Sequence, residues 1–291
     1  MTSAPPAAPA MEASASPAPP ARSGPAAALP PPRPVAAMTV FFALLRRDLI
    51  VARREIVSFL IRTALQPLLT VMVFGYLLPS MGFTSRGYVG VLLPGILAIS
   101  LAFASLQSVA LPMMTDFGFT REIDDRLLAP VPIGLVPLEK VVSGMIQGMI
   151  SALVVLPMAR LIMGPIPGLS VDNIAVVLGV TLLGSATFAS LGLWLGTAIP
   201  PQQIGLMFSV ILAPMIFFGC AYYPWAGLHK VPVLQYAVLA NPLVYVAESL
   251  RGAVTPSLPH MPLAASCGAM VVIALLLWLA GHRSFWKRAM S

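Results

Sequence analysis

Long apolar runs constrain this chain more than any other feature. Six runs of about 20 residues carry few charges, and they fall at Val57–Leu78, Val89–Met113, Val141–Met163, Ile174–Ile199, Ile204–Tyr222 and Leu263–Ala280. At about 1.5 Å per residue, each is long enough as a helix to cross a hydrocarbon core of about 30 Å. Buried helices of a soluble protein would give runs of about 10–14 residues. The sequence therefore predicts an all-α, polytopic membrane protein with six transmembrane helices.

The placement of basic residues predicts the orientation. Six spans put both termini on one side, and ten flanking Lys and Arg residues fall there against four on the other. Because Lys and Arg accumulate in cytoplasmic loops, we expect both termini in the cytoplasm. The net charge of +7 is then a topology signal, and we expect no nucleic-acid partner. The ten are Arg46, Arg47, Arg53, Arg54, Arg121, Arg126, Lys140, Arg283, Lys287 and Arg288; the four are Arg86, Arg160, Lys230 and Arg251.

Two different segments precede the first span. Residues 1–37 are nearly all Ala, Pro and Ser, so we expect a disordered tail, and Met38 is an alternative start. Residues 38–56 place Phe42, Leu45 and Leu49 at helical spacing, interleaved with basic residues. This pattern predicts an amphipathic helix in the cytoplasmic interface that contacts anionic lipid headgroups. Its candidate lipid contacts are Arg46, Arg47, Arg53 and Arg54. Residues 57–291 form the six-span domain.

A short helix is predicted between the fifth and sixth spans, in "NPLVYVAESLRG". Asn241 suits the N-cap, Pro242 the first helical position, and Gly252 the position after the last turn. About ten residues cannot cross a bilayer, so we expect a re-entrant or interfacial helix. Glu248 and Arg251 are three residues apart and can pair on one face.

Aromatic residues gather at the end of the fifth span, in "MIFFGCAYYPW". Phe217, Phe218, Tyr222 and Tyr223 are candidate gate residues, and interfacial anchoring by the tyrosines and Trp225 is an equal alternative. Gln107, Ser108, Gln202 and Gln203 are polar residues that suit either substrate contact or helix–helix hydrogen bonding.

A compact charged segment, "TREIDDRLLAPVP", separates the second and third spans. Arg121 and Asp125, and Glu122 and Arg126, are opposite charges at i,i+4, and an apolar face includes Leu127. Asp124 adds a third acid. Loop charges that only enforced topology would be mainly Lys and Arg. The balanced charges therefore favour a cytoplasmic helix that docks against a protein over a solvated loop.

Small residues and cysteines leave alternatives open. Gly144 with Gly148, and Gly192 with Gly196, match the small-xxx-small spacing of close helix packing, within or between subunits. The sequence favours free buried thiols over a disulfide for Cys220 and Cys267, because the two residues form no Cys-rich framework.

The chain lacks the signatures of an energy source or a catalytic centre. It contains no phosphate-binding glycine loop, no HExxH and no serine or cysteine nucleophile set beside a histidine. We identify no catalytic residue, no metal site and no clearly buried acid in the spans. Energy would have to come from another polypeptide.

The basic helix before the first span, "TREIDDRLLAPVP" followed by "LEKVVSG", and "NPLVYVAESLRG" together resemble the permease subunits of ABC type-2 exporters. The resemblance extends from about Leu44 to the C-terminus. It implies two permease chains, as a homodimer or heterodimer, and two separate ATPase chains that bind ATP and Mg²⁺, so that this chain binds no cofactor. By similarity, Arg121–Leu128 is the ATPase-coupling helix, Asn241–Arg251 belongs to an outer hairpin, and spans two and five line the path.

The expected function follows from the resemblance. We expect a non-catalytic permease in the bacterial inner membrane that exports an amphipathic drug-like molecule or lipid by alternating access. The alternatives are export of a polysaccharide or lipid-linked glycan, and an ATP-independent carrier or channel.

Overall fold

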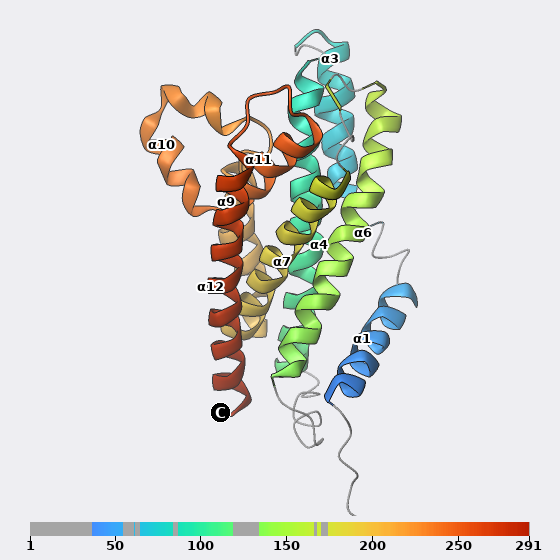
Figure 1. Ribbon diagram of the computed structural model, residues 1–291, viewed down its shortest axis with the longest axis vertical. Coiled ribbons are helices and arrows are strands. Elements are labelled where there is room, and N and C mark those ends of the chain that lie inside the picture. Colours follow the sequence, from blue (N-terminus) through green and yellow to red (C-terminus); the bar gives the residue numbers. More distant parts are fainter. Residues whose placement is uncertain are drawn as a thin grey trace, which may run out of the picture. The chain divides into compact units, whose positions relative to one another are not determined.

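A computed structural model describes residues 37–54, 61, 65–83, 87–118, 134–165, 168–169 and 174–290. Every regular element in these ranges is helical, as predicted (Figure 1). The disordered tail predicted for residues 1–37 lies almost entirely outside them. The elements are α1 (Ala37–Arg54), η1 (Val71–Leu77), α3 (Leu78–Ser80), α4 (Tyr88–Gly118), α6 (Leu135–Met163), α7 (Ile174–Ala198), η2 (Pro201–Gln203), α8 (Ile204–Leu206), η3 (Met207–Leu212), α9 (Ala213–Phe217), η4 (Trp225–Lys230), α10 (Pro232–Ala237), η5 (Val238–Ala240), α11 (Pro242–Val254) and α12 (Leu263–Ala289).

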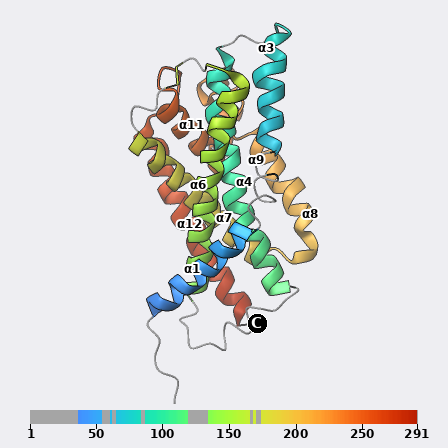
Figure 2. The same cartoon turned by 90° about the vertical axis from the view of Figure 1, so that its right-hand side faces the viewer.

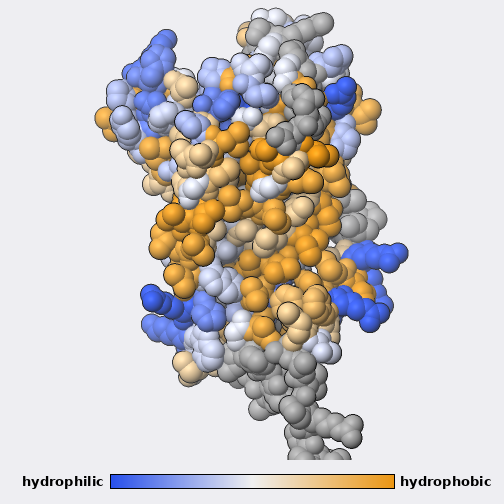
Figure 3. All heavy atoms as spheres, viewed as in Figure 1, coloured by the Kyte–Doolittle hydropathy of each residue, from blue (hydrophilic) through white to orange (hydrophobic). Residues whose placement is uncertain are grey.

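Four helices, α4, α6, α7 and α12, are long and apolar enough to cross a membrane. They correspond to the second, third, fourth and sixth predicted spans. On the face shown in Figure 3, hydrophobic side chains form a band across the middle of the bundle, and hydrophilic ones gather at both ends. One end carries α1 and the C-terminal end of α12, and the other carries α11 (Figures 1 and 2). We call these the α1 end and the α11 end.

Within the described residues, the first and fifth predicted spans contain shorter, irregular helices. Leu65–Ser80, here segment one, contains the π-helix η1, and Pro201–Phe217, here segment five, contains the π-helix η3. Segment five ends at Phe217, not at Tyr222 as predicted. Phe218 leaves the helical region with a ψ of 10°, and Cys220 then adopts a positive φ of 51°, which is incompatible with a resumed α-helix.

Helix α4 forms the centre of the bundle. Its most apolar stretch is 89% buried, against 11% for that of α12. Both small-residue pairs pack against α4, so they serve contacts within one chain. Gly144 and Gly148 bring α6 close to it, and Gly192 and Gly196 do the same for α7. A Cβ atom at Gly192 would lie 2.6 Å from the Leu106 carbonyl oxygen, so a larger residue would push the backbones apart.

The predicted amphipathic helix forms as α1 and runs obliquely across α6 (Figure 2). Leu45 and Leu49 are half-buried on its inner face. Phe42, predicted on the same face, is instead 58% exposed. An ion pair of 2.5 Å between Asp48 and Lys140 fixes α1 to α6. Both the salt bridge and the apolar contacts therefore hold this helix against the bundle.

Candidate functional site

Helix α11 is the element that organises the α11 end. The Asn241 side-chain oxygen accepts a hydrogen bond of 3.0 Å from the Leu243 amide, and Pro242 occupies the first turn, as predicted. The helix runs on to Val254, so Gly252 lies inside it rather than after it. Gly252 serves packing: a Cβ atom there would lie 3.0 Å from His260 Nδ1. Helix α11 bends by 99° from the preceding segment, Pro232–Ala240.

A buried ion pair sits on one face of α11. The Arg251 guanidinium contacts the Glu248 carboxylate, as the i,i+3 spacing predicted, and both side chains are fully buried. Ions removed from water are costly unless further hydrogen bonds satisfy them. Their remaining bonds go to backbone groups, which the sequence gives no means to identify.

Those four backbone groups belong to three separate segments. Glu248 accepts hydrogen bonds from the amides of Trp225 at 2.8 Å and Met261 at 2.9 Å. Arg251 donates to the carbonyls of Cys220 at 3.1 Å and Val91 at 3.4 Å. Glu248, Arg251 and these four backbone groups are here named the clamp. It joins α11 to α4, to the loop after segment five, and to the residue pair before α12.

The expectation of no clearly buried acid in the spans is wrong at the ends of two membrane-capable helices, and Glu248, outside the spans on α11, is fully buried as well. Asp116 and Glu139 are buried, with exposures of 7% and 0%. Asp116 lies near the end of α4 and Glu139 near the start of α6. Single acids at helix ends are not distinguishable from surface residues by hydropathy, which explains the error.

The four candidate gate residues divide into two pairs. Phe217 and Phe218 are 65% and 47% exposed. Tyr222 instead packs in a tilted arrangement against Phe74 of segment one, with the ring centroids 5.7 Å apart. Tyr223 donates a hydrogen bond of 2.8 Å to the Phe217 carbonyl. Burial raises the pKa of Tyr223, so its hydroxyl, already neutral at physiological pH, remains a donor to higher pH. The tyrosines are held by packing, and the phenylalanines present free apolar surface.

An apolar groove lies beside these phenylalanines. It has a volume of about 440 Å³, between segment five and the elements α10, η5 and the start of α11. Phe218 contributes to its wall, and Asn241 is the one polar side chain among its lining residues. The Asn241 side-chain amide donates to the Met215 carbonyl at 2.7 Å. The groove therefore suits an apolar group better than a strongly polar one.

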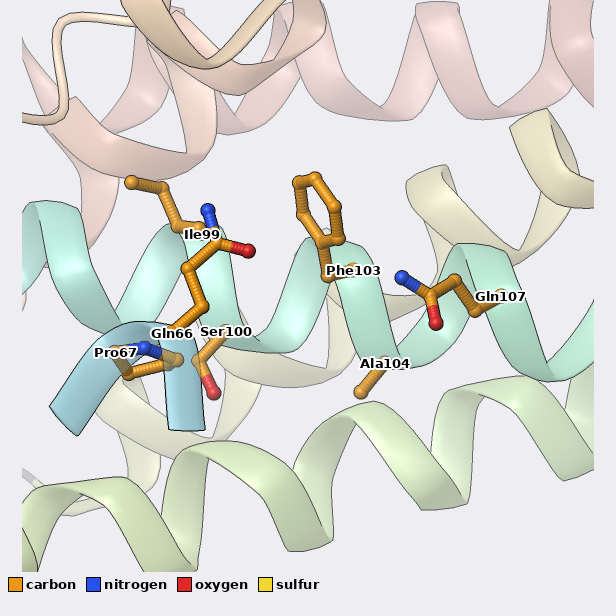
Figure 4. A pocket seen from close by; sticks show the side chains of 7 residues that line it. All are labelled: Gln66, Pro67, Ile99, Ser100, Phe103, Ala104 and Gln107. Carbon is orange, nitrogen blue, oxygen red and sulfur yellow. The ribbon is translucent and has the colours of Figure 1, made fainter. Parts of the chain in front are cut away.

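The polar residues singled out in the spans occupy different environments. Gln107 and Ser100 of α4 line a cavity of about 30 Å³ with Gln66 of segment one (Figure 4). Ser108 donates to a carbonyl of its own helix. Gln202 and Gln203 are exposed at the start of segment five. The small cavity holds about one water molecule, not a substrate.

The α1 end carries most of the described basic residues. Arg46, Arg47, Arg53 and Arg54 of α1 are all exposed. Arg288, near the end of α12, donates to the Thr197 carbonyl at 3.1 Å and lies over the Phe117 ring at 4.9 Å. It thereby links α12 to the ends of α7 and α4.

The predicted coupling residues, Arg121, Glu122, Asp124, Asp125, Arg126 and Leu127, lie outside the described residues. Their flanks are described. Gly118, at the end of α4, adjoins Pro201, and Gly134, just before α6, adjoins His282 of α12. The two described flanks of the charged segment therefore both lie at the α1 end, which also carries most of the described basic residues.

The cysteines and metal-ligand residues form no special site. Cys220 and Cys267 are both free. In the described parts of the chain, no group of three His, Cys, Asp or Glu residues could hold a metal ion.

Comparison with known proteins identifies the family. The model of the ABC-2 type transporter family matches residues 39–255, which is most of the chain. The inner membrane transport permease YadH of Escherichia coli K12 is 26% identical over 228 residues, covering 75% of this chain and 85% of YadH. YadH of Shigella flexneri matches to the same extent. With its long apolar helices, the chain is therefore a multi-pass protein of the inner membrane, and it belongs to the ABC-2 type transporter family as a transport permease.

Proposed function

We propose that this chain is the membrane subunit of an ATP-driven exporter. The observation that carries the proposal is the family match, because it spans the charged segment between α4 and α6 as well as α11. In this proposal a separate ABC ATPase binds ATP and Mg²⁺ and docks on Arg121–Leu128. Its closure moves that segment, and the spans re-tilt to open a path on the opposite side by alternating access. ATP biases the two states by its different affinity for each.

The proposed topology has six spans with both termini in the cytoplasm. Segments one and five, together with the four long helices, make up the six spans. The elements α10 to α11 form an outer re-entrant hairpin. The distribution of charge supports this orientation, since Arg46, Arg53, Lys140 and Lys287 are on elements of the α1 end, and Lys230 is on the α11 end. Positive residues favour the cytoplasmic side. The exposed arginines of α1 would then contact anionic lipid headgroups.

A second permease chain would cover segment five. The exposed face of segment five contains the polar residues Gln203 and Ser209 as well as Leu206 and Val210. Polar side chains are costly against lipid and usually face protein or a water-filled path. The paired chains would enclose the path between them, as a homodimer or a heterodimer.

The groove beside Phe218 supports an amphipathic substrate with an apolar portion, such as a drug-like molecule or a lipid. On this reading, Ala237→Trp, which narrows the groove, lowers ATP-dependent uptake of such compounds into inside-out vesicles. Val233→Trp is the matched control, because Val233 is 84% exposed and is not among the residues that line the groove. Unchanged transport by the Ala237 variant would show that the groove is not part of the translocation path.

The test of the docking step is a charge reversal. Glu122→Lys combined with Asp125→Lys should leave membrane insertion intact while abolishing co-purification of the ATPase and export. Asp172→Lys, in the loop between α6 and α7, controls for added positive charge and should change neither. Retention of the ATPase and of transport by the double variant would show that this segment is not the docking site.

A further inference from the structure

A second groove, on a different side of the bundle, faces the surrounding membrane. Helices α6 and α7 line its sides, and Leu97 of α4 with Leu250 and Val254 of α11 also contribute. Its volume is about 330 Å³, which is within the range of sites that bind small molecules. Segment five contributes no lining residue, so the groove is separate from the one beside Phe218.

The lining of this groove favours an apolar ligand. Its single polar residue is Thr181, and that hydroxyl already donates to the Val177 carbonyl at 2.7 Å. The remaining lining side chains are hydrocarbon or thioether groups. Leu153 and Leu178, at the rim, are 70% and 49% exposed. Because α6 and α7 are membrane-capable helices, the phase that meets this rim is acyl chain, not water.

A positive charge stands at one end of the same face. Arg160 is exposed and follows Leu153 by seven residues and Leu156 by four, so all three lie on one side of α6. A spacing of four residues places Arg160 about 6 Å beyond Leu156 along the helix. It is three residues before Met163, where α6 ends. A guanidinium at a helix end lies at the level of the lipid headgroups.

We propose that the groove between α6 and α7 binds a phospholipid of the leaflet at the α11 end. One acyl chain fills the groove, and the phosphate contacts Arg160. Lipid tails are as apolar as leucine, so the chain is held by close packing against the groove rather than by hydrophobic transfer. The phosphate adds a charge-assisted contact, since a guanidinium binds phosphate oxygens bidentately.

The acyl chain bound in this groove also touches α11, the helix that carries Glu248 and Arg251 of the clamp. Leu250 lines the groove, and the next residue, Arg251, belongs to the clamp. A lipid in this site therefore packs against the helix that is joined to three other segments at the α11 end. Loss of the lipid should loosen α11 without removing any bond of the clamp.

Native mass spectrometry of the full-length protein tests the proposal, with phosphatidylglycerol and phosphatidylethanolamine added separately. The wild-type protein should retain one phospholipid that Leu153→Trp and Ala152→Phe lose, because their rings occupy the groove. Leu276→Trp is the matched control; Leu276 is 62% exposed on α12 and should keep the lipid. Two groove variants are used because Ala152 is buried and its replacement is the more disruptive.

The headgroup contact has its own readout. Arg160→Gln should weaken phosphatidylglycerol binding about fivefold, the effect of one basic residue near an anionic lipid, while the acyl chain still binds. Lys287→Gln, at the other end of the bundle, should leave the affinity unchanged. Equal lipid retention by the wild type and both groove variants would overturn the proposal. So would dissociation of a dimer into monomers by the groove variants, because the groove would then be a contact between chains.

Discussion

Replacing Arg251 with methionine tests whether the clamp holds the α11 end together. Methionine fills similar space but leaves the Glu248 carboxylate fully buried without its cation. The Cys220 and Val91 carbonyls also lose a donor. Removing one partner of a buried ion pair costs about 3–5 kcal/mol, chiefly because the other charge stays buried. For a chain of this size about 1 kcal/mol lowers the Tm by about 2–4 °C, so we expect a fall on the order of 10 °C.

The assay is thermal unfolding of the purified protein in detergent, followed by intrinsic fluorescence. A second variant, Glu248→Gln with Arg251→Met, removes the stranded charge. The glutamine oxygen can still accept from one of the two amides that Glu248 binds, so one amide is left unpaired, at about 1–3 kcal/mol. The double variant should therefore be more stable than Arg251→Met alone. Arg251→Lys should not retain the wild-type stability, because one ammonium cannot reproduce the contacts of the planar guanidinium.

Lys230→Met is the control, since Lys230 is exposed at the same end and its loss should change stability by less than about 0.5 kcal/mol. A Tm for Arg251→Met within 2–3 °C of the control would refute the reasoning. So would a double variant that is less stable than Arg251→Met, because the penalty would then not arise from the stranded carboxylate.

Three further changes probe packing at other points. Gly148→Ala should lower the Tm in the same assay, because its Cβ would lie 1.9 Å from a serine oxygen of α4, whereas Gly179→Ala has open space and should not. Lys140→Met removes the cation that holds α1 and should speed amide hydrogen exchange in α1 but not in α12; unchanged exchange would mean that apolar contacts suffice. Asn241→Asp keeps the helix cap but replaces the amide donor with an oxygen facing a carbonyl, so it should be less stable than the wild type, and equal stability would assign the role of Asn241 to capping alone.

The sequence predicted most reliably where one physical signal acted alone. The four long spans follow from apolar length, and the start of α11 from the cap chemistry of Asn241 and Pro242. The pairing of Glu248 with Arg251 follows from helical spacing. In each case the cause lies within a few residues of sequence, so no tertiary contact was needed to infer it.

Predictions failed where tertiary packing overrode the local signal. Gly252 has the sequence character of a helix stop, yet α11 continues past it because the missing side chain makes room for His260. The apolar run through Tyr222 looks continuous, but the helix ends at Phe217, and Cys220 turns its carbonyl toward Arg251. The backbone partners of the clamp could not be foreseen, because backbone groups are the same in every sequence.

Contacts at both ends of α4 bear on how the proposed docking step would reach the path. At the α1 end, a Cβ on Gly118 would lie 2.1 Å from the Pro201 ring, so α4 and the start of segment five touch directly. At the α11 end, a Cβ on Gly95 would lie 1.7 Å from the Ala221 carbonyl, just past the end of segment five. A displacement of the charged segment, which begins two residues after Gly118, would therefore be carried by one continuous helix to both ends of segment five. Close-packed interiors transmit such shifts rather than absorb them, so the ATPase would need no direct contact with segment five to move it.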